Sequence, residues 1–104
     1  MRFLGNAFSA GMLVEDSTVT FMFLDVEDAR AWTKQEFSSC VGHADTAAIV
    51  SVLLDTPVGM NRSSTELNRG DELLVAQYNG PRLPEGATSL PEGAKIRWIL
   101  ATVH

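Results

Sequence analysis

The sequence predicts one small α/β (α+β) domain, built on a four- to five-stranded, mostly mixed sheet flanked by helices. Strand-type segments alternate with helix-type segments along the chain, which is typical of such folds. The 104 residues have room for one domain with a sizeable core, and 45% hydrophobic with 20% charged residues is an ordinary globular composition. No stretch has the composition of a linker between domains. We therefore expect residues 1–104 to form a single domain.

The first half of the chain predicts two strands and a helix. Met1–Gly5 is a short apolar strand candidate, and Thr18–Leu24 is rich in β-branched and aromatic residues on both of its faces. We expect this second strand to lie inside the sheet. Asp25 can cap a helix over Val26–Gln35, with Asp28 as the acid three residues later. This helix should be half exposed.

A second helix and two strong strands follow. His43–Leu54 is apolar nearly all round, which predicts a buried helix. Glu72–Tyr78 and Lys95–Val103 contain continuous apolar runs suited to strands that are buried on both faces.

The segment between the last two strands carries an internal repeat. Leu-Pro-Glu-Gly-Ala occurs twice within Asn79–Ala94, at Leu83–Ala87 and again at Leu90–Ala94. Proline and glycine in each copy are incompatible with a helical seam, so the repeat predicts two successive turns in a loop.

Charge and composition exclude several partners. Eight basic and thirteen acidic side chains give a net charge of −5, which argues against binding duplex DNA through a basic face. No apolar run approaches the length of a membrane span, the first residues lack a signal sequence, and the single cysteine fits a reducing compartment, so we expect a cytoplasmic protein that does not bind membranes. Residues 60–104 hold five of the eight basic side chains, so an anion would find most of its cations there.

The familiar cofactor and metal motifs are missing. The chain has no phosphate-binding glycine loop, no dinucleotide fingerprint and no nucleophile elbow. Cys40 and His43 are spaced as two zinc ligands, but a structural zinc site needs four, and the other histidine is His104. We expect no cofactor and no metal, with Cys40 as a small apolar residue rather than a nucleophile.

His43 and Arg82 are the residues best placed for chemistry on an anion. His43 follows Gly42 where the second helix begins, and free backbone N–H groups at such a position attract phosphates. Histidine exchanges a proton near neutral pH and can protonate a leaving oxygen. Arg82 lies in a proline-rich loop where a guanidinium can bind phosphate bidentately. A structural histidine and a solvated arginine are the alternatives.

Two further polar groups adjoin predicted strand or turn ends. Asn6 and Ser9 follow the first strand, which is a usual location for sites in α/β sheets, although Ser9 could equally cap a short helix. Asn61-Arg62 could contact phosphate or form a turn.

Taken in order, these fragments resemble the small viral ring-nuclease family, whose members act as anti-CRISPR proteins against type III CRISPR defence and have relatives in bacterial type III loci. The resemblance runs from Arg2 to Val103, essentially the whole chain. The matching fragments are Asn6-Ala7-Phe8-Ser9 with Met12-Leu13, Gly42-His43, Asn61-Arg62, Gly70-Asp71, Gln77 and Arg82-Leu83-x-Glu85-Gly86.

The resemblance implies metal-independent cleavage of cyclic tetra-adenylate, the second messenger of type III systems, to linear di-adenylates. It implies a two-fold homodimer that binds one ring across the subunit interface. It also implies catalytic roles at His43, Arg82 and Glu85. Ligand-contacting or supporting positions fall on Asn6, Ser9, Arg62 and Gln77.

Two other functions are compatible with the same residues. A binding protein could sequester a cyclic oligonucleotide without cleaving it, with His43 as a hydrogen-bond donor. A small interaction protein could use the same residues structurally, and would then gain no thermal stability from the ring.

Overall fold

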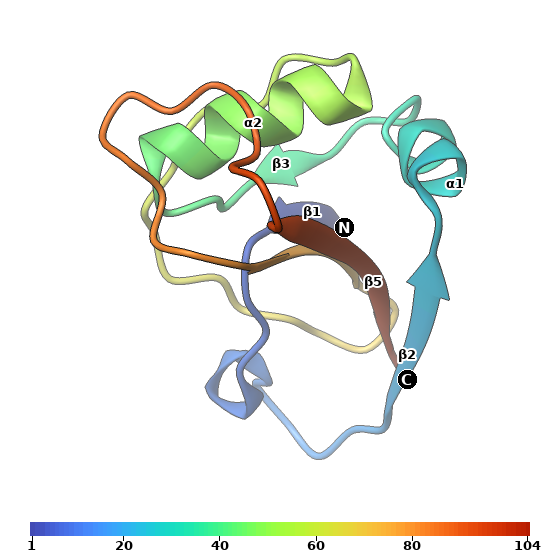
Figure 1. Cartoon of the computed structure of the whole chain (residues 1–104). Helices are drawn as coiled ribbons and strands as arrows, with labels where there is room; N and C mark the ends of the chain where they lie inside the picture. The colour runs from blue at the N-terminus through green and yellow to red at the C-terminus, as the bar shows by residue number, and fades with distance from the viewer.

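A five-stranded mixed sheet forms the centre of the molecule, as the computed structural model of residues 1–104 shows (Figure 1). The strands lie in the order β2-β5-β4-β1-β3. Together with two helices they make one small α+β domain, which confirms the predicted fold class. The elements are β1 (Arg2–Gly5), a 3₁₀ turn η1 (Ala10–Met12), β2 (Val19–Leu24), α1 (Val26–Trp32), β3 (Ser38–Ser39), α2 (Ala44–Leu54), β4 (Glu72–Asn79) and β5 (Lys95–Val103).

The two long apolar strands occupy the middle of the sheet. β4 pairs antiparallel with β5 over its whole length and parallel with β1 from Glu72 to Val75. Continuous apolar runs predicted that both strands are buried on both faces. This is confirmed for β4, whose Leu73 and Leu74 are fully buried on opposite faces, whereas Ile99 and Leu100 of β5 are only half-buried. β3 was missed because two serines carry no strand signal.

The expectation that the second strand lies inside the sheet is wrong. β2 is an edge strand that pairs only with β5. Phe21, Met22 and Phe23 are 52%, 55% and 69% exposed. A strand with apolar residues on both faces is typical of the interior of a sheet. An edge strand whose apolar side chains remain exposed has the same sequence pattern, so the pattern alone does not separate the two positions.

Both helices are shorter or less buried than expected. α1 ends at Trp32 rather than Gln35, although its start is as predicted, with Asp25 accepting the N–H of Asp28 at 2.8 Å. α2 buries one face only, and Val52 on its outer side is 67% exposed. Neither helix has the length and apolar character that crossing a membrane requires.

The helices cover one face of the sheet and leave the other to loops (Figure 1). α1 and α2 pack on the face that presents Leu74, Ala76 and Trp98. On the opposite face, Leu73 and Val75 are covered by the segment around η1 and by the loop that follows α2. The sheet is therefore flanked by helices on one side only. The apolar cluster around Leu73 and Val75, on the other side, is covered by loop segments instead of helices.

The repeat forms two matching turns, as predicted. Ala87 N–H donates to Pro84 O at 3.1 Å, and Ala94 N–H donates to Pro91 O at 3.0 Å. The third residues of the two turns, Gly86 and Gly93, have φ of 79° and 80°, a conformation that favours glycine. Between these turns and β4, the chain arches past the amino end of α2 (Figure 1).

Candidate functional site

A cleft of about 390 Å³ lies between the first turn of α2 and the loop that follows β4. It brings together His43 and Arg82, which are far apart in the sequence. The six residues that line it are His43, Asp45, Thr46, Tyr78, Arg82 and Leu83.

His43 stands at the helix start, as its sequence position predicted. It is the N-cap of α2, with extended backbone angles of φ −132° and ψ 133°, and its exposed imidazole makes no capping hydrogen bond. The backbone N–H groups of Ala44, Asp45 and Thr46 have no acceptor within the protein. Four N–H groups at a helix start lack intrahelical partners, and the helix dipole makes that end positive. The mouth of the cleft can therefore hold an anion next to the imidazole.

The loop from Gly80 to Leu83 presents Arg82 to the same cleft. The phenol of Tyr78, at the end of β4, donates a hydrogen bond to Pro81 O. Gly80 is required here, because a Cβ on it would lie 2.6 Å from the Cβ of Ala94. The guanidinium of Arg82 is exposed and has no hydrogen bond or ion pair within the protein, so it is free to bind a ligand.

Asn6 and Arg62 meet at Gly42, the residue that precedes His43. Asn6 Oδ1 accepts the N–H of Gly42 at 3.2 Å, which fixes the backbone leading into α2. Arg62 Nε lies about 4.0 Å from where a Cβ on Gly42 would stand. The neighbouring Asn61 holds this loop in place, since its amide donates to Ser39 O at 2.9 Å. Asn6 and Arg62 are thus grouped at the start of α2, and neither lines the cleft.

The other three sequence-predicted site residues do not line the cleft. Glu85 is exposed in the first turn of the repeat and forms no ion pair with Arg82. Ser9 caps η1, accepting the N–H of Gly11 at 3.2 Å, which is the structural alternative for this residue. Gln77 points from β4 to the sheet face opposite Tyr78, because successive strand residues alternate between faces.

Three of the cleft residues, Asp45, Thr46 and Tyr78, had no site role assigned from the sequence. Tyr78 is adjacent to Gln77 and shares strand parity with the buried Leu74 and Ala76, so alternation alone places it on the helix-covered face. Asp45 and Thr46 lie in the first turn of α2, where any ligand of the helix start must pass them.

Cys40 does not line the His43 cleft. A Cβ on Gly5 would lie 2.7 Å from its Sγ, so the thiol packs against the end of β1. No group of three or more His, Cys, Asp or Glu side chains is arranged to hold a metal ion.

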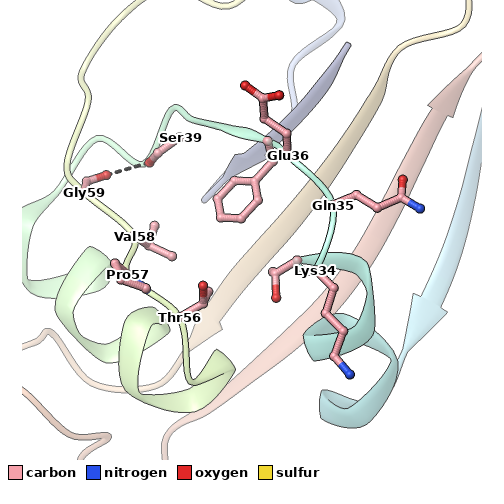
Figure 2. Close-up of a pocket in the computed structure, with 10 residues that line it drawn as sticks. Lys34, Gln35, Glu36, Ser39, Thr56, Pro57, Val58 and Gly59 are labelled. Carbon is pink, nitrogen blue, oxygen red and sulfur yellow. Dashed lines mark hydrogen bonds between the residues drawn. The ribbon is translucent and has the colours of Figure 1, made fainter.

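A second cavity of about 390 Å³ lies between the segment after α1 and the segment after α2 (Figure 2). Lys34 and Glu36 are on one side, and Thr56 to Gly59 on the other. Ser39 Oγ joins the two sides by donating to Gly59 O at 2.6 Å. This cavity has no histidine, and Lys34 is accompanied by the carboxylate of Glu36, so its chemistry suits an anion less well than the His43 cleft.

A family model, a related sequence and a solved structure each match nearly the whole chain. A model of the family described as STIV B116-like matches residues 2–97. A protein named "Uncharacterized protein ORF116", from Acidianus filamentous virus 1 (isolate United States/Yellowstone), is 31% identical over 111 residues, which cover 98% of this chain and 95% of the relative. The solved structure of B116 of Sulfolobus turreted icosahedral virus is 31% identical, with a TM-score of 0.82 over 97% of each chain.

Proposed function

The chain belongs to the STIV B116-like family of small viral proteins, and from this premise we propose that it is a metal-independent ring nuclease that cleaves cyclic tetra-adenylate to linear di-adenylates. In a host cell with type III CRISPR defence this activity would remove the second messenger, and the protein would act as an anti-CRISPR protein. The proposal combines the sequence resemblance with the chemistry of the His43 cleft.

The observation that carries the proposal is the meeting of His43 and Arg82 at the start of α2. The cleft offers a proton donor, a guanidinium and the first turn of α2, where the backbone N–H groups of Asp45 and Thr46 have no acceptor in the protein. These are the groups that transfer of a phosphodiester requires, namely an acid for the leaving oxygen and donors for the charge on phosphorus oxygens.

The substrate supplies its own nucleophile in this reaction. A ribose 2′-oxygen attacks the adjacent phosphorus, a new P–O bond forms, and the bond to the 5′-oxygen breaks. The 2′-hydroxyl proton passes to water, and the protonated imidazole of His43 gives its proton to the departing 5′-oxygen. The products are a 2′,3′-cyclic phosphate and a free 5′-hydroxyl, and no step is assigned to a metal.

Arg82 and the first turn of α2 stabilise charge in this scheme. A guanidinium can donate two parallel hydrogen bonds to a phosphate, which gives orientation as well as attraction. The N–H groups of Ala44 to Thr46 add donors at the positive end of the helix dipole. Arg62, beside Gly42, is available for a second phosphate of the ring.

A two-fold homodimer suits a ring of four identical nucleotides. An isologous interface repeats every surface patch, so two copies of His43 can address opposite phosphates of one ring. Two cuts at opposite positions give two di-adenylates. The dimer is accordingly part of the proposal.

The test is multiple-turnover incubation of the protein with cyclic tetra-adenylate in excess EDTA, with products resolved by mass. We expect di-adenylates from the wild type and a loss of about 10²- to 10⁴-fold in rate for His43→Ala, the usual range for general-acid catalysis. His104→Ala is the matched control. It removes an exposed histidine side chain, and the backbone hydrogen bonds between His104 and Thr18 do not depend on that side chain.

The possible outcomes separate the functions. Tight binding of the ring without turnover would replace the nuclease with a protein that sequesters a cyclic oligonucleotide. Absence of both binding and a thermal shift would leave an interaction protein that shares only the fold.

A further inference from the structure

We infer that Asp45 is a positioning residue that holds the Arg82 loop against α2, an inference that rests on the proposed function for its catalytic consequence. Asp45 Oδ1 accepts the backbone N–H of Gly86 at 3.1 Å. The two residues are 41 positions apart, and their hydrogen bond joins the first turn of α2 to the first turn of the repeat.

Arg82 lies between two such attachments. On its amino-terminal side, the phenol of Tyr78 binds Pro81 O and ties the loop to the end of β4. On its carboxy-terminal side, Gly86 is bound by Asp45, which is half-buried beside the helix start. The segment from Arg82 to Glu85, exposed except at the half-buried Leu83, is thus fixed at both ends, although its own side chains make no ion pair.

The chain contains its own comparison for the Asp45 bond. The second copy of the repeat forms the same turn, with nearly the same φ at Gly93 as at Gly86, and a Cβ on either glycine would meet nothing within 4 Å. Gly93 N–H has no side-chain acceptor, whereas Gly86 N–H has Asp45. The Asp45 bond is therefore not needed to form the turn, and its effect is to place the first copy next to the cleft.

Asp45 would otherwise be a poor choice at a phosphate site. A carboxylate near the helix start is stabilised by the dipole, but it repels an incoming anion. Binding Gly86 N–H gives this carboxylate a function that an apolar residue could not replace. Holding a catalytic group near its working position can change a rate by about 10²-fold per ångström of misplacement, and Arg82 here is held through the loop rather than directly.

The test compares Asp45→Ala with Asp45→Asn, which retains an oxygen that accepts Gly86 N–H. We expect Asp45→Ala to lose about tenfold in kcat/KM for cyclic tetra-adenylate, and Asp45→Asn to recover most of that loss. If the charge of Asp45 matters instead of its hydrogen bond, the two variants will behave alike, which would overturn the inference. Glu92→Ala, in the second turn, is the matched control and should leave the rate unchanged.

A second measurement reads the loop without any substrate. Amide hydrogen exchange should be about fivefold slower at Gly86 than at Gly93 in the wild type, and the difference should vanish in Asp45→Ala. Equal exchange at the two glycines in the wild type would refute the attachment, whatever the kinetics show. If the wild type neither cleaves nor binds the ring, the proposed function fails, and exchange at Gly86 compared with Gly93 alone decides whether Asp45 holds the loop.

Discussion

Arg82 is the side chain whose surroundings best match a ligand-binding role. It is exposed, it lines the cleft with His43, and it has no partner in the protein. Arginine on a surface usually extends into solvent, but this one follows Pro81, whose carbonyl is held by Tyr78. The backbone next to Arg82 is thus fixed, while the guanidinium has no partner. This arrangement reduces the conformational entropy lost when a ligand binds.

Replacing Arg82 should therefore impair both binding and cleavage. We expect Arg82→Ala to lower kcat/KM for cyclic tetra-adenylate by about 10²-fold. This is the usual effect of removing one hydrogen-bond donor to the charge that develops in the transition state. Arg82→Lys should recover only part of this loss, because an ammonium cannot donate bidentately. Steady-state kinetics of the three proteins measure the effect.

Arg97→Ala is the control for net charge. It removes the same unit of charge from β5, where Arg97 is in register with Gln77 and lies over Phe23, away from the cleft. An equal loss of activity in Arg97→Ala and Arg82→Ala would show that overall charge, and not the loop arginine, controls the reaction.

At the scale of elements, Asp71 joins the starts of β1 and β4. Its carboxylate accepts the Met1 amino group at 2.7 Å and Asn68 N–H at 2.9 Å, and its side chain is 9% exposed. Burial by itself would raise the pKa of Asp71, but these hydrogen bonds and the positive charge of the amino group lower it below its ordinary value of 3.8. The charged form is therefore favoured in the folded protein.

This shift predicts a pH-dependent contribution to stability. A carboxyl group whose pKa is lower when folded stabilises the protein fully above its ordinary, unfolded pKa, here 3.8, and the contribution is lost as pH falls through the folded pKa. We expect Asp71→Asn to lower the free energy of unfolding by about 1–2 kcal/mol at neutral pH, less than for a fully buried pair because the Met1 amino group is exposed. The difference should shrink below about pH 4.

Urea unfolding across a pH series measures this difference. Asp16→Asn serves as the control, since the side chain of Asp16 is exposed and makes no hydrogen bond or ion pair. A destabilisation by Asp71→Asn that stays constant down to pH 3 would contradict the linkage and point to packing instead.

Element by element, the sequence was most informative where pattern and packing coincide. Lys95–Val103 was predicted with the observed bounds, and the repeated turns were predicted from proline and glycine alone. β2 was misplaced because its neighbours in the sheet depend on long-range pairing, which local composition does not encode. β3 has only two residues and owes its strand geometry to pairing with β1.

The candidate site was likewise predicted only as far as local sequence pattern determines it. His43 could be located because it precedes a strongly apolar helix, and Arg82 because it lies in a loop. Asp45 and Tyr78 had no site role of their own assigned from the sequence, since their importance comes from contacts with the loop that only the folded chain brings about.

At the scale of the whole molecule, overall charge opposes the proposed substrate. Two chains at −5 each would give a dimer of −10, while the ring carries four phosphates. Long-range attraction therefore cannot guide the ring to the protein. The available cations are local ones, Arg62 beside Gly42 and Arg82 in the cleft, assisted by the N–H groups of α2.

This balance predicts an association rate that depends little on salt. Screening acts over about 10 Å at 0.1 M ionic strength, so added salt weakens both the general repulsion and the local attraction. For the His43→Ala variant, which should bind without cleaving, we expect the association rate constant to change less than about threefold between roughly 50 and 300 mM NaCl. Stopped-flow mixing with a fluorescent ring measures it. A steep fall with salt would mean that a positive field reaches beyond the cleft, and the two arginines and the helix start would then be insufficient to explain capture of the ring.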